Sequence, residues 1–140
     1  GVLDQLAVRG VSDEGVAAAK LVAHWLGFGP PLMIAAIPAA GLLRLSGETL
    51  WQLELGLLFG TPGLAALALM VAALTASLRG AGPLAGLLML PLAVPLLIFG
   101  AGSLDLAAGG GALKLLAACS MFAVALCPFV AGAALRAARD

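Results

Sequence analysis

Four long apolar stretches, separated by short polar segments, set the pattern of the chain. They cover about residues 15–43, 50–78, 83–104 and 112–135. Each exceeds the roughly 20 residues that a helix needs to cross the ~30 Å hydrocarbon layer of a bilayer. None alternates apolar and polar positions as the strand of a membrane barrel does. The pattern therefore predicts an all-α integral membrane protein, a single domain built as a bundle of four transmembrane helices.

A short amphipathic segment, residues 1–11, precedes the first span. Leu3 and Leu6 share one helical face, while Asp4 and Gln5 lie elsewhere on its surface. The segment is too short and too polar to cross a membrane. Two interpretations fit it equally: a helix that lies on the lipid surface, or a coupling helix that docks into a groove of a partner protein.

Polar residues mark where the first two spanning helices should begin. Ser12 is expected to cap the first helix, with Asp13 and Glu14 in the first turn, where acidic side chains suit the helix dipole. Ser46 is expected to cap the second helix, with Glu48 in its first turn. These residues separate the lipid-spanning stretches from the polar connections.

Prolines interrupt every span. The stretch LLMLPLAVPLLIFGAG, residues 87–102, holds two prolines four residues apart. Each proline removes a backbone N–H donor and crowds the carbonyl of the preceding turn, and in lipid such carbonyls need protein or a wet cavity to satisfy them. This stretch therefore suggests a helix that packs, bends or opens. The residues expected to shape the helices are Pro30, Pro31, Pro62, Pro91, Pro95 and Gly100.

Two further features concern how the spans pack. The sequence GFGPP, residues 27–31, is expected to break the first span about halfway. A single broken span is favoured over two segments joined by a re-entrant turn. In the second span, Gly56 and Gly60 form a small-xxx-small pair that lets helices approach closely.

Composition agrees with a membrane protein. The mean hydropathy is +1.16 and 10% of residues are charged, against roughly 25% in soluble domains. Seven basic and seven acidic residues cancel, and nothing points to nucleic acid as a partner. More basic residues fall on the side of the two chain ends than on the other side, so the positive-inside rule predicts that both ends are cytoplasmic. The first group is Arg9, Lys20, Arg79, Arg136 and Arg139, and the second is Arg44 and Lys114.

His24, the only histidine, lies one turn after Lys20 and next to Trp25. We expect this group at the membrane interface, where Lys snorkels and Trp anchors. An interface side chain is the favoured interpretation of His24, and a heme or metal ligand is the alternative. No second ligand stands at a spacing that would complete a metal site.

Other candidate residues are few. Glu54 lies about one turn inside the second span, where a buried carboxylate is costly and often functional, although its nearness to Trp51 suggests that it reaches the outer interface. Cys119 and Cys127, eight residues apart, fit neither a CxxC redox motif nor a metal cluster. The sequence has no hydrolase arrangement of side chains and no GxxxxGK[ST] phosphate loop. We therefore predict no enzyme, and any ATP would be bound by another subunit.

Four segments together resemble a known family. They are GVLDQLAVRGVSDEGVAAAKLVAHW, LLFGTPGLAALALMVAALTASLRGAG, LMLPLAVPLLIFGAG and ALCPFVAGAALR. In this order they resemble the CcmB family, the heme exporter B proteins of cytochrome c biogenesis, over nearly the whole chain. The resemblance implies the permease subunit of an ABC-type system in the bacterial inner membrane. Family members have six spans, so this chain is expected to be the C-terminal two-thirds.

The resemblance also implies partners and a role. The partners are an ATPase subunit (CcmA), a heme-handling membrane subunit (CcmC), a small membrane subunit (CcmD) and a periplasmic heme chaperone (CcmE), with this subunit as a homodimer. Leu3, Asp4, Gln5 and Leu6 would meet the ATPase, and heme would be the transported or handled group. The permease would pass ATP-driven motion to the membrane. The alternatives are a passive scaffold for the heme-handling subunit, or the permease of another ABC-2-type exporter.

Overall fold

The computed structural model describes residues 2, 5, 8–76, 78, 80–108 and 110–138. Within these residues the regular elements are helices and no strand is present. They are α2 (Asp13–Leu42), α3 (Gly47–Thr75), α4 (Ala81–Gly102), the short 3₁₀ helix η1 (Leu106–Ala108) and α5 (Gly111–Ala137). The four α-helices are all long and apolar enough to cross a membrane. The predicted all-α bundle of four spans is confirmed.

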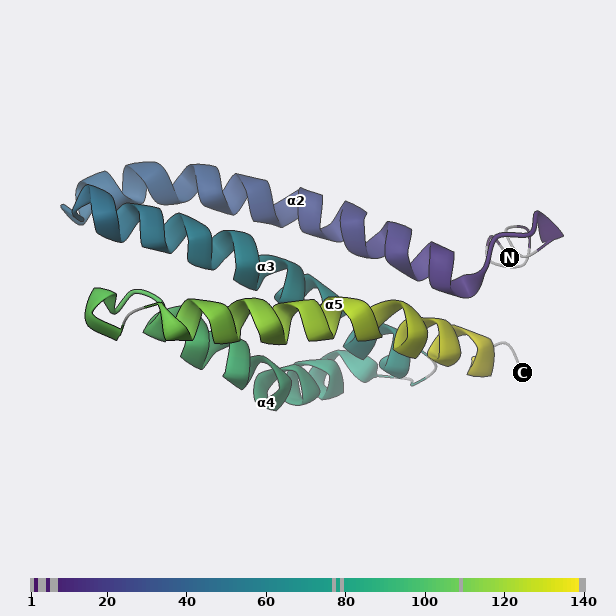
Figure 1. Cartoon of the computed structure of the whole chain (residues 1–140). Helices are drawn as coiled ribbons and strands as arrows, with labels where there is room; N and C mark the ends of the chain where they lie inside the picture. Colours follow the sequence, from purple (N-terminus) through teal and green to yellow (C-terminus); the bar gives the residue numbers. More distant parts are fainter. Residues whose placement is uncertain are drawn as a thin grey trace.

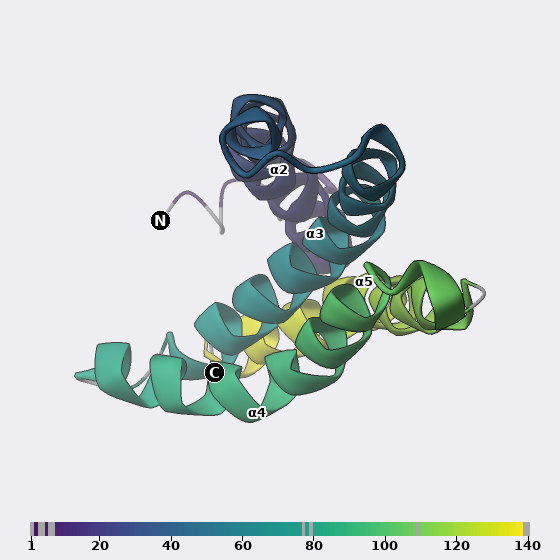
Figure 2. The same cartoon turned by 90° about the vertical axis from the view of Figure 1, so that its left-hand side faces the viewer.

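Consecutive helices run in opposite directions along the bundle (Figure 1). The start of α2 and the end of α5 consequently lie at the same end, which we call the terminal end. The α2–α3 and α4–α5 connections lie at the other end, which we call the loop end. Figure 2 shows α3 passing diagonally through the bundle, and α3 and α5 each pack against all the other long helices. The α3–α5 pair forms the centre, with α2 and α4 at its sides.

Serine side chains cap the N-termini of α2 and α3, as the sequence predicts. The Ser12 hydroxyl accepts a hydrogen bond from the Gly15 N–H at 3.1 Å. The Ser46 hydroxyl accepts one from the Thr49 N–H at 3.2 Å. Each cap satisfies one of the N–H groups that a helix start leaves without a partner.

Glycines bring the backbones of α3 and α5 close together. A Cβ atom added to Gly63 would stand 2.9 Å from the Cα of Ser120, and one added to Gly60 would stand 3.5 Å from the side chain of Leu116. A Cβ added to Gly56 would stand 3.1 Å from the hydroxyl of Ser103, which caps the end of α4. The close approach expected at Gly56 and Gly60 is therefore present, and it is tightest at Gly63, which the sequence pattern does not single out.

The core lies between α3 and α5 and contains mainly small and medium apolar side chains. Ala65, Ala66 and Cys127 have no exposed surface, and Leu116 has 1%. In α4 the buried residues are Ala93 and Leu96. The outward faces are rich in leucine, isoleucine and phenylalanine, and lipid can cover such faces at no cost.

The expected break at residues 27–31 is wrong. Helix α2 continues from Asp13 to Leu42 with Pro30 and Pro31 inside it, and the re-entrant alternative is wrong as well. Without water, the alternative to a helix is a larger number of unpaired backbone groups. A helix that forgoes the hydrogen bonds of two prolines is therefore the less costly arrangement.

We expect Gly63→Ala to destabilise the bundle by about 1–3 kcal/mol, as overpacking does, because its Cβ would meet the Ser120 backbone. The matched control is Gly86→Ala in α4, where a Cβ has nothing within 4 Å. It should leave stability unchanged or raise it by up to about 1 kcal/mol, since Ala is the better helix former. Unfolding in mixed detergent micelles, followed by circular dichroism, measures both. Equal stability of the two variants would contradict the packing argument.

Candidate functional site

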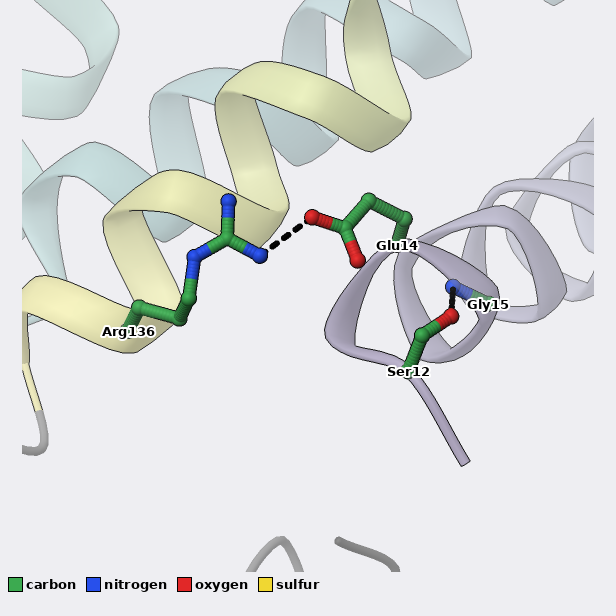
Figure 3. A network of polar contacts seen from close by, with 4 residues as sticks. All are labelled: Ser12, Glu14, Gly15 and Arg136. Atoms are coloured by element: carbon green, nitrogen blue, oxygen red, sulfur yellow. Dashed lines mark hydrogen bonds and ion pairs between the residues drawn. The ribbon is translucent and has the colours of Figure 1, made fainter. Parts of the chain in front are cut away.

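An ion pair joins α2 and α5 at the terminal end (Figure 3). The Arg136 guanidinium donates a hydrogen bond from Nη1 to Oε1 of Glu14, a residue 122 positions earlier in the chain. Glu14 stands in the first turn of α2, next to the Ser12 cap. Arg136 stands in the last turn of α5, where a positive side chain suits the helix dipole. The side chains remain 51% and 31% exposed for Arg136 and Glu14.

Below the ion pair the two helices touch through a glycine. A Cβ on Gly132 would stand 3.3 Å from the backbone nitrogen, Cγ and Cδ of Glu14. Ala131 and Gly132 are buried on α5, and Val16 and Ala17 are buried on α2. The first turn of α2 is therefore held against α5 by packing as well as by charge.

The segment proposed for coupling leads into this end of the bundle. Leu3, Asp4 and Leu6 lie outside the described residues. Gln5 is helical and exposed, and its carbonyl accepts a hydrogen bond from the Arg9 N–H at 3.3 Å. Gly10 then takes a φ of +77°, a conformation that glycine adopts without strain. The segment therefore turns at Gly10 immediately before the capped start of α2.

Two apolar side chains of this segment are largely exposed. Val2 and Val8 are helical and 73% and 89% exposed. Both residues precede α2 in the chain and belong to none of the four long helices. Exposed apolar side chains there suit a lipid surface or a partner groove.

Trp25 links α2 to α3 within the bundle. Its indole N–H donates to the Thr61 hydroxyl at 2.9 Å, and that hydroxyl donates to the Leu57 carbonyl at 2.6 Å. Thr61 is buried, and the indole lies against Gly29, where any side chain would collide with it. Trp25 follows Asp13 by about 18 Å along the helix. The expectation that Trp25 is an interfacial anchor is wrong, because its polar atom is used inside the protein.

The two polar candidates within the spans differ in their surroundings. His24 is exposed on α2, and its ring lies 5.4 Å from that of Phe28, centre to centre. Glu54 is half-buried, and its Oε1 atom is enclosed without a hydrogen-bond partner among the described residues. The carboxylate therefore does not simply extend toward water, as its position near Trp51 suggests. In the part of the chain described, no three potential metal ligands come together.

Apolar grooves lie between the described helices, and some of the expected helix-shaping residues border them. Pro95 borders a groove of about 420 Å³ between α3, α4 and α5. Gly100 borders one of about 340 Å³ beside Thr61 and Ser103. Pro62 borders a third, of about 330 Å³, between α3 and α5. Pro30 is half-buried, whereas Pro31 and Pro91 are exposed.

The terminal-end contact is the feature that sequence reasoning misses. The sequence pattern marks Glu14 only as a first-turn acid and Arg136 only as a topological charge, and it does not mark Gly132. No local sequence pattern predicts a contact between residues 122 positions apart. The available signals are a glycine in a run of small residues and two opposite charges at helix ends.

Comparison with known proteins gives a consistent result. A family description, "CcmB protein", matches residues 1–138. "Heme exporter protein B" of Paracoccus denitrificans is 46% identical over 140 residues, which cover 97% of this chain and 64% of that relative. The protein of the same name from Haemophilus influenzae is 43% identical over 145 residues, covering 100% and 65%. That of Escherichia coli K12 is 38% identical over 140 residues, covering 97% and 64%. The chain thus spans 64–65% of the length of these relatives.

We expect the Trp25–Thr61 hydrogen bond to stabilise the contact between α2 and α3. Trp25→Phe removes the N–H donor, Thr61→Val removes the acceptor, and the double variant closes a cycle. The cycle should give a coupling of about 0.6 kcal/mol and at most about 1.7, the range for hydrogen bonds between membrane helices. Trp51→Phe, at a tryptophan that is 65% exposed, is the matched control and should show no coupling to Thr61→Val. Purely additive effects of the Trp25 and Thr61 changes in micelle unfolding would disprove the contribution.

Proposed function

The chain belongs to the CcmB protein family, and from this premise we propose that it is a membrane permease component of an ABC-type complex that handles heme in cytochrome c maturation. The match over residues 1–138 and the relatives named heme exporter protein B support this. The chain spans less than two thirds of those relatives. The activity, the substrate and the partners are therefore all parts of the proposal.

We propose that the protein passes motion from an ATPase to the membrane. The sequence has no GxxxxGK[ST] loop of its own, so the nucleotide would be bound by a partner, the ATPase CcmA. The observation that carries the proposal is that Val2, Gln5 and Val8, which are helical residues at the terminal end, have exposed side chains. This segment leads through Gly10 into the capped first turn of α2, which in turn contacts α5.

The orientation and the other partners follow from the same proposal. The terminal end would face the cytoplasm of a bacterium, and the loop end would face CcmE. CcmC, CcmD and a second copy of this protein would lie against the outer apolar faces. Heme would be handled through apolar contact with grooves such as the one beside Pro95. His24 is exposed on α2, which gives a role as heme ligand inside the bundle no support.

We expect Leu6→Arg and Val8→Arg to reduce co-purification of the ATPase with the intact protein, because a charge would replace the apolar contact. Cytochrome c yield should fall in parallel. Leu45→Arg, at an exposed leucine of the loop end, is the matched control and should leave co-purification unchanged. Unchanged association and unchanged cytochrome c yield in both variants would count against coupling through this segment.

We expect Pro91→Ala and Pro95→Ala to leave the complex assembled but to reduce cytochrome c maturation. Each change restores a backbone N–H in α4 and so allows a straighter, stiffer helix, and Pro95 also borders the groove of about 420 Å³. The measurement is the protein composition of the purified complex beside cytochrome c yield. A passive scaffold predicts full activity whenever assembly is complete, and that outcome would replace the permease proposal.

A further inference from the structure

We propose that Glu14, Gly132 and Arg136 form a joint that makes α2 and α5 move as one body when the segment before α2 is displaced. We call it the α2–α5 joint. The inference rests on the proposed coupling at residues 1–11, and it goes beyond it by naming the positioning residues that carry the displacement into the bundle.

The joint stands where a displacement would arrive. Gly10, at φ +77°, is where the described part of residues 1–11 turns just before α2. After it, the Ser12 cap fixes the first turn of α2. Glu14 of that turn reaches directly to Arg136 (Figure 3). A displacement of the segment that is not absorbed at Gly10 is therefore passed to α2 and, through the joint, to α5. No loop lies between Ser12 and the joint to absorb it.

Helix α5 can carry the displacement onward because it is tightly packed along its length. At Gly132 its backbone lies so close to Glu14 that an added Cβ would stand 3.3 Å from three atoms of that residue, tighter than an ordinary van der Waals contact. At Ser120 it touches Gly63 of α3, which is closer still. Close-packed contacts of this kind do not compress. Movement of the joint is therefore passed from α5 to α3, beside the groove that Pro95 borders.

The ion pair itself is poorly placed to stabilise the fold. Both side chains keep a large part of their surface in contact with solvent, and exposed pairs contribute little to stability. Helices α2 and α5 also pack against each other directly, with Ala17 and Ala131 buried, so their contact does not depend on the pair. The pair does fix the direction in which the first turn of α2 meets the end of α5. A positioning role follows from this geometry more readily than a role in folding.

The test uses the intact complex in lipid vesicles, with three readouts: co-purified ATPase, thermal unfolding of the permease, and ATP-dependent heme delivery to the acceptor. Glu14→Gln and Arg136→Gln each break the pair with little change in size. Both should keep assembly and unfolding temperature and should lower delivery about fivefold or more, the lower range of coupling between sites. Lys20→Gln removes an exposed charge on α2 that belongs neither to the joint nor to the loop end, and it should have no effect.

Rescue by charge exchange separates pairing from local disturbance. Asp13 also acts on Arg136 electrostatically, so the exchange Glu14→Arg with Arg136→Glu is made together with Asp13→Asn. It is compared with Asp13→Asn alone. Recovery of delivery to the level of Asp13→Asn supports the joint, even if the single variants accumulate poorly. Folded and assembled exchange variants that stay inactive overturn it, as do single variants with wild-type delivery.

Gly132→Leu tests the contact without changing a charge. It should separate the start of α2 from α5 and reduce delivery while the ATPase stays bound, whereas Gly86→Leu in α4, where a Cβ meets nothing within 4 Å, should not. Full delivery by Gly132→Leu would also overturn the joint. The joint and the proposed function fail in different ways. If the unchanged protein neither binds an ATPase nor supports delivery, the proposed function is wrong, whereas wild-type behaviour of all joint variants in an active complex rejects only the joint.

Discussion

The bundle depends on the backbone contact of α3 and α5 at Gly63 and Ser120. Apolar side chains gain almost nothing by leaving lipid for protein, so membrane helices associate through close packing and hydrogen bonds instead. Glycine at position 63 allows the approach, and the fully buried Ala65, Ala66 and Cys127 extend it along the interface. Because these side chains are small, the two helices stay close together along a long part of their interface. The positions of α2 and α4 then follow from the surfaces that this pair offers.

Polar groups add direction to this packing. The hydroxyl of Thr61 accepts a hydrogen bond from the indole N–H of Trp25 and donates one to the Leu57 carbonyl. The polar atoms of that contact are therefore paired within the protein rather than facing lipid. Gln52 likewise donates to the carbonyl of Ser103, near the end of α4. Each of these bonds joins α3 to a different neighbour. The central helix is therefore fixed in rotation as well as in position.

The spans and the helix caps can be predicted from sequence because their causes are local. Lipid requires long apolar helices, and Ser12 and Ser46 cap them through hydrogen bonds three residues away. The break at residues 27–31 is predicted from the local sequence GFGPP, whereas in lipid the freed carbonyls of a broken helix would find no solvent. Trp25 is assigned to the interface from its place near the start of a span, whereas its partner Thr61 lies 36 residues away. In both errors the surroundings that decide the outcome lie outside the local sequence.

The surroundings of the terminal end also make it suited to receive a force. Along the spans, the outer faces meet lipid, which yields to any displacement and transmits none. At the terminal end the first turn of α2 meets α5 through Gly132, and the ion pair of Glu14 and Arg136 stands above that contact. A displacement entering before Ser12 therefore meets protein rather than lipid. Since α5 is the helix most closely packed against α3, a displacement reaches the centre of the bundle through α5 as well as through the direct contact of α2 with α3 at Trp25 and Thr61.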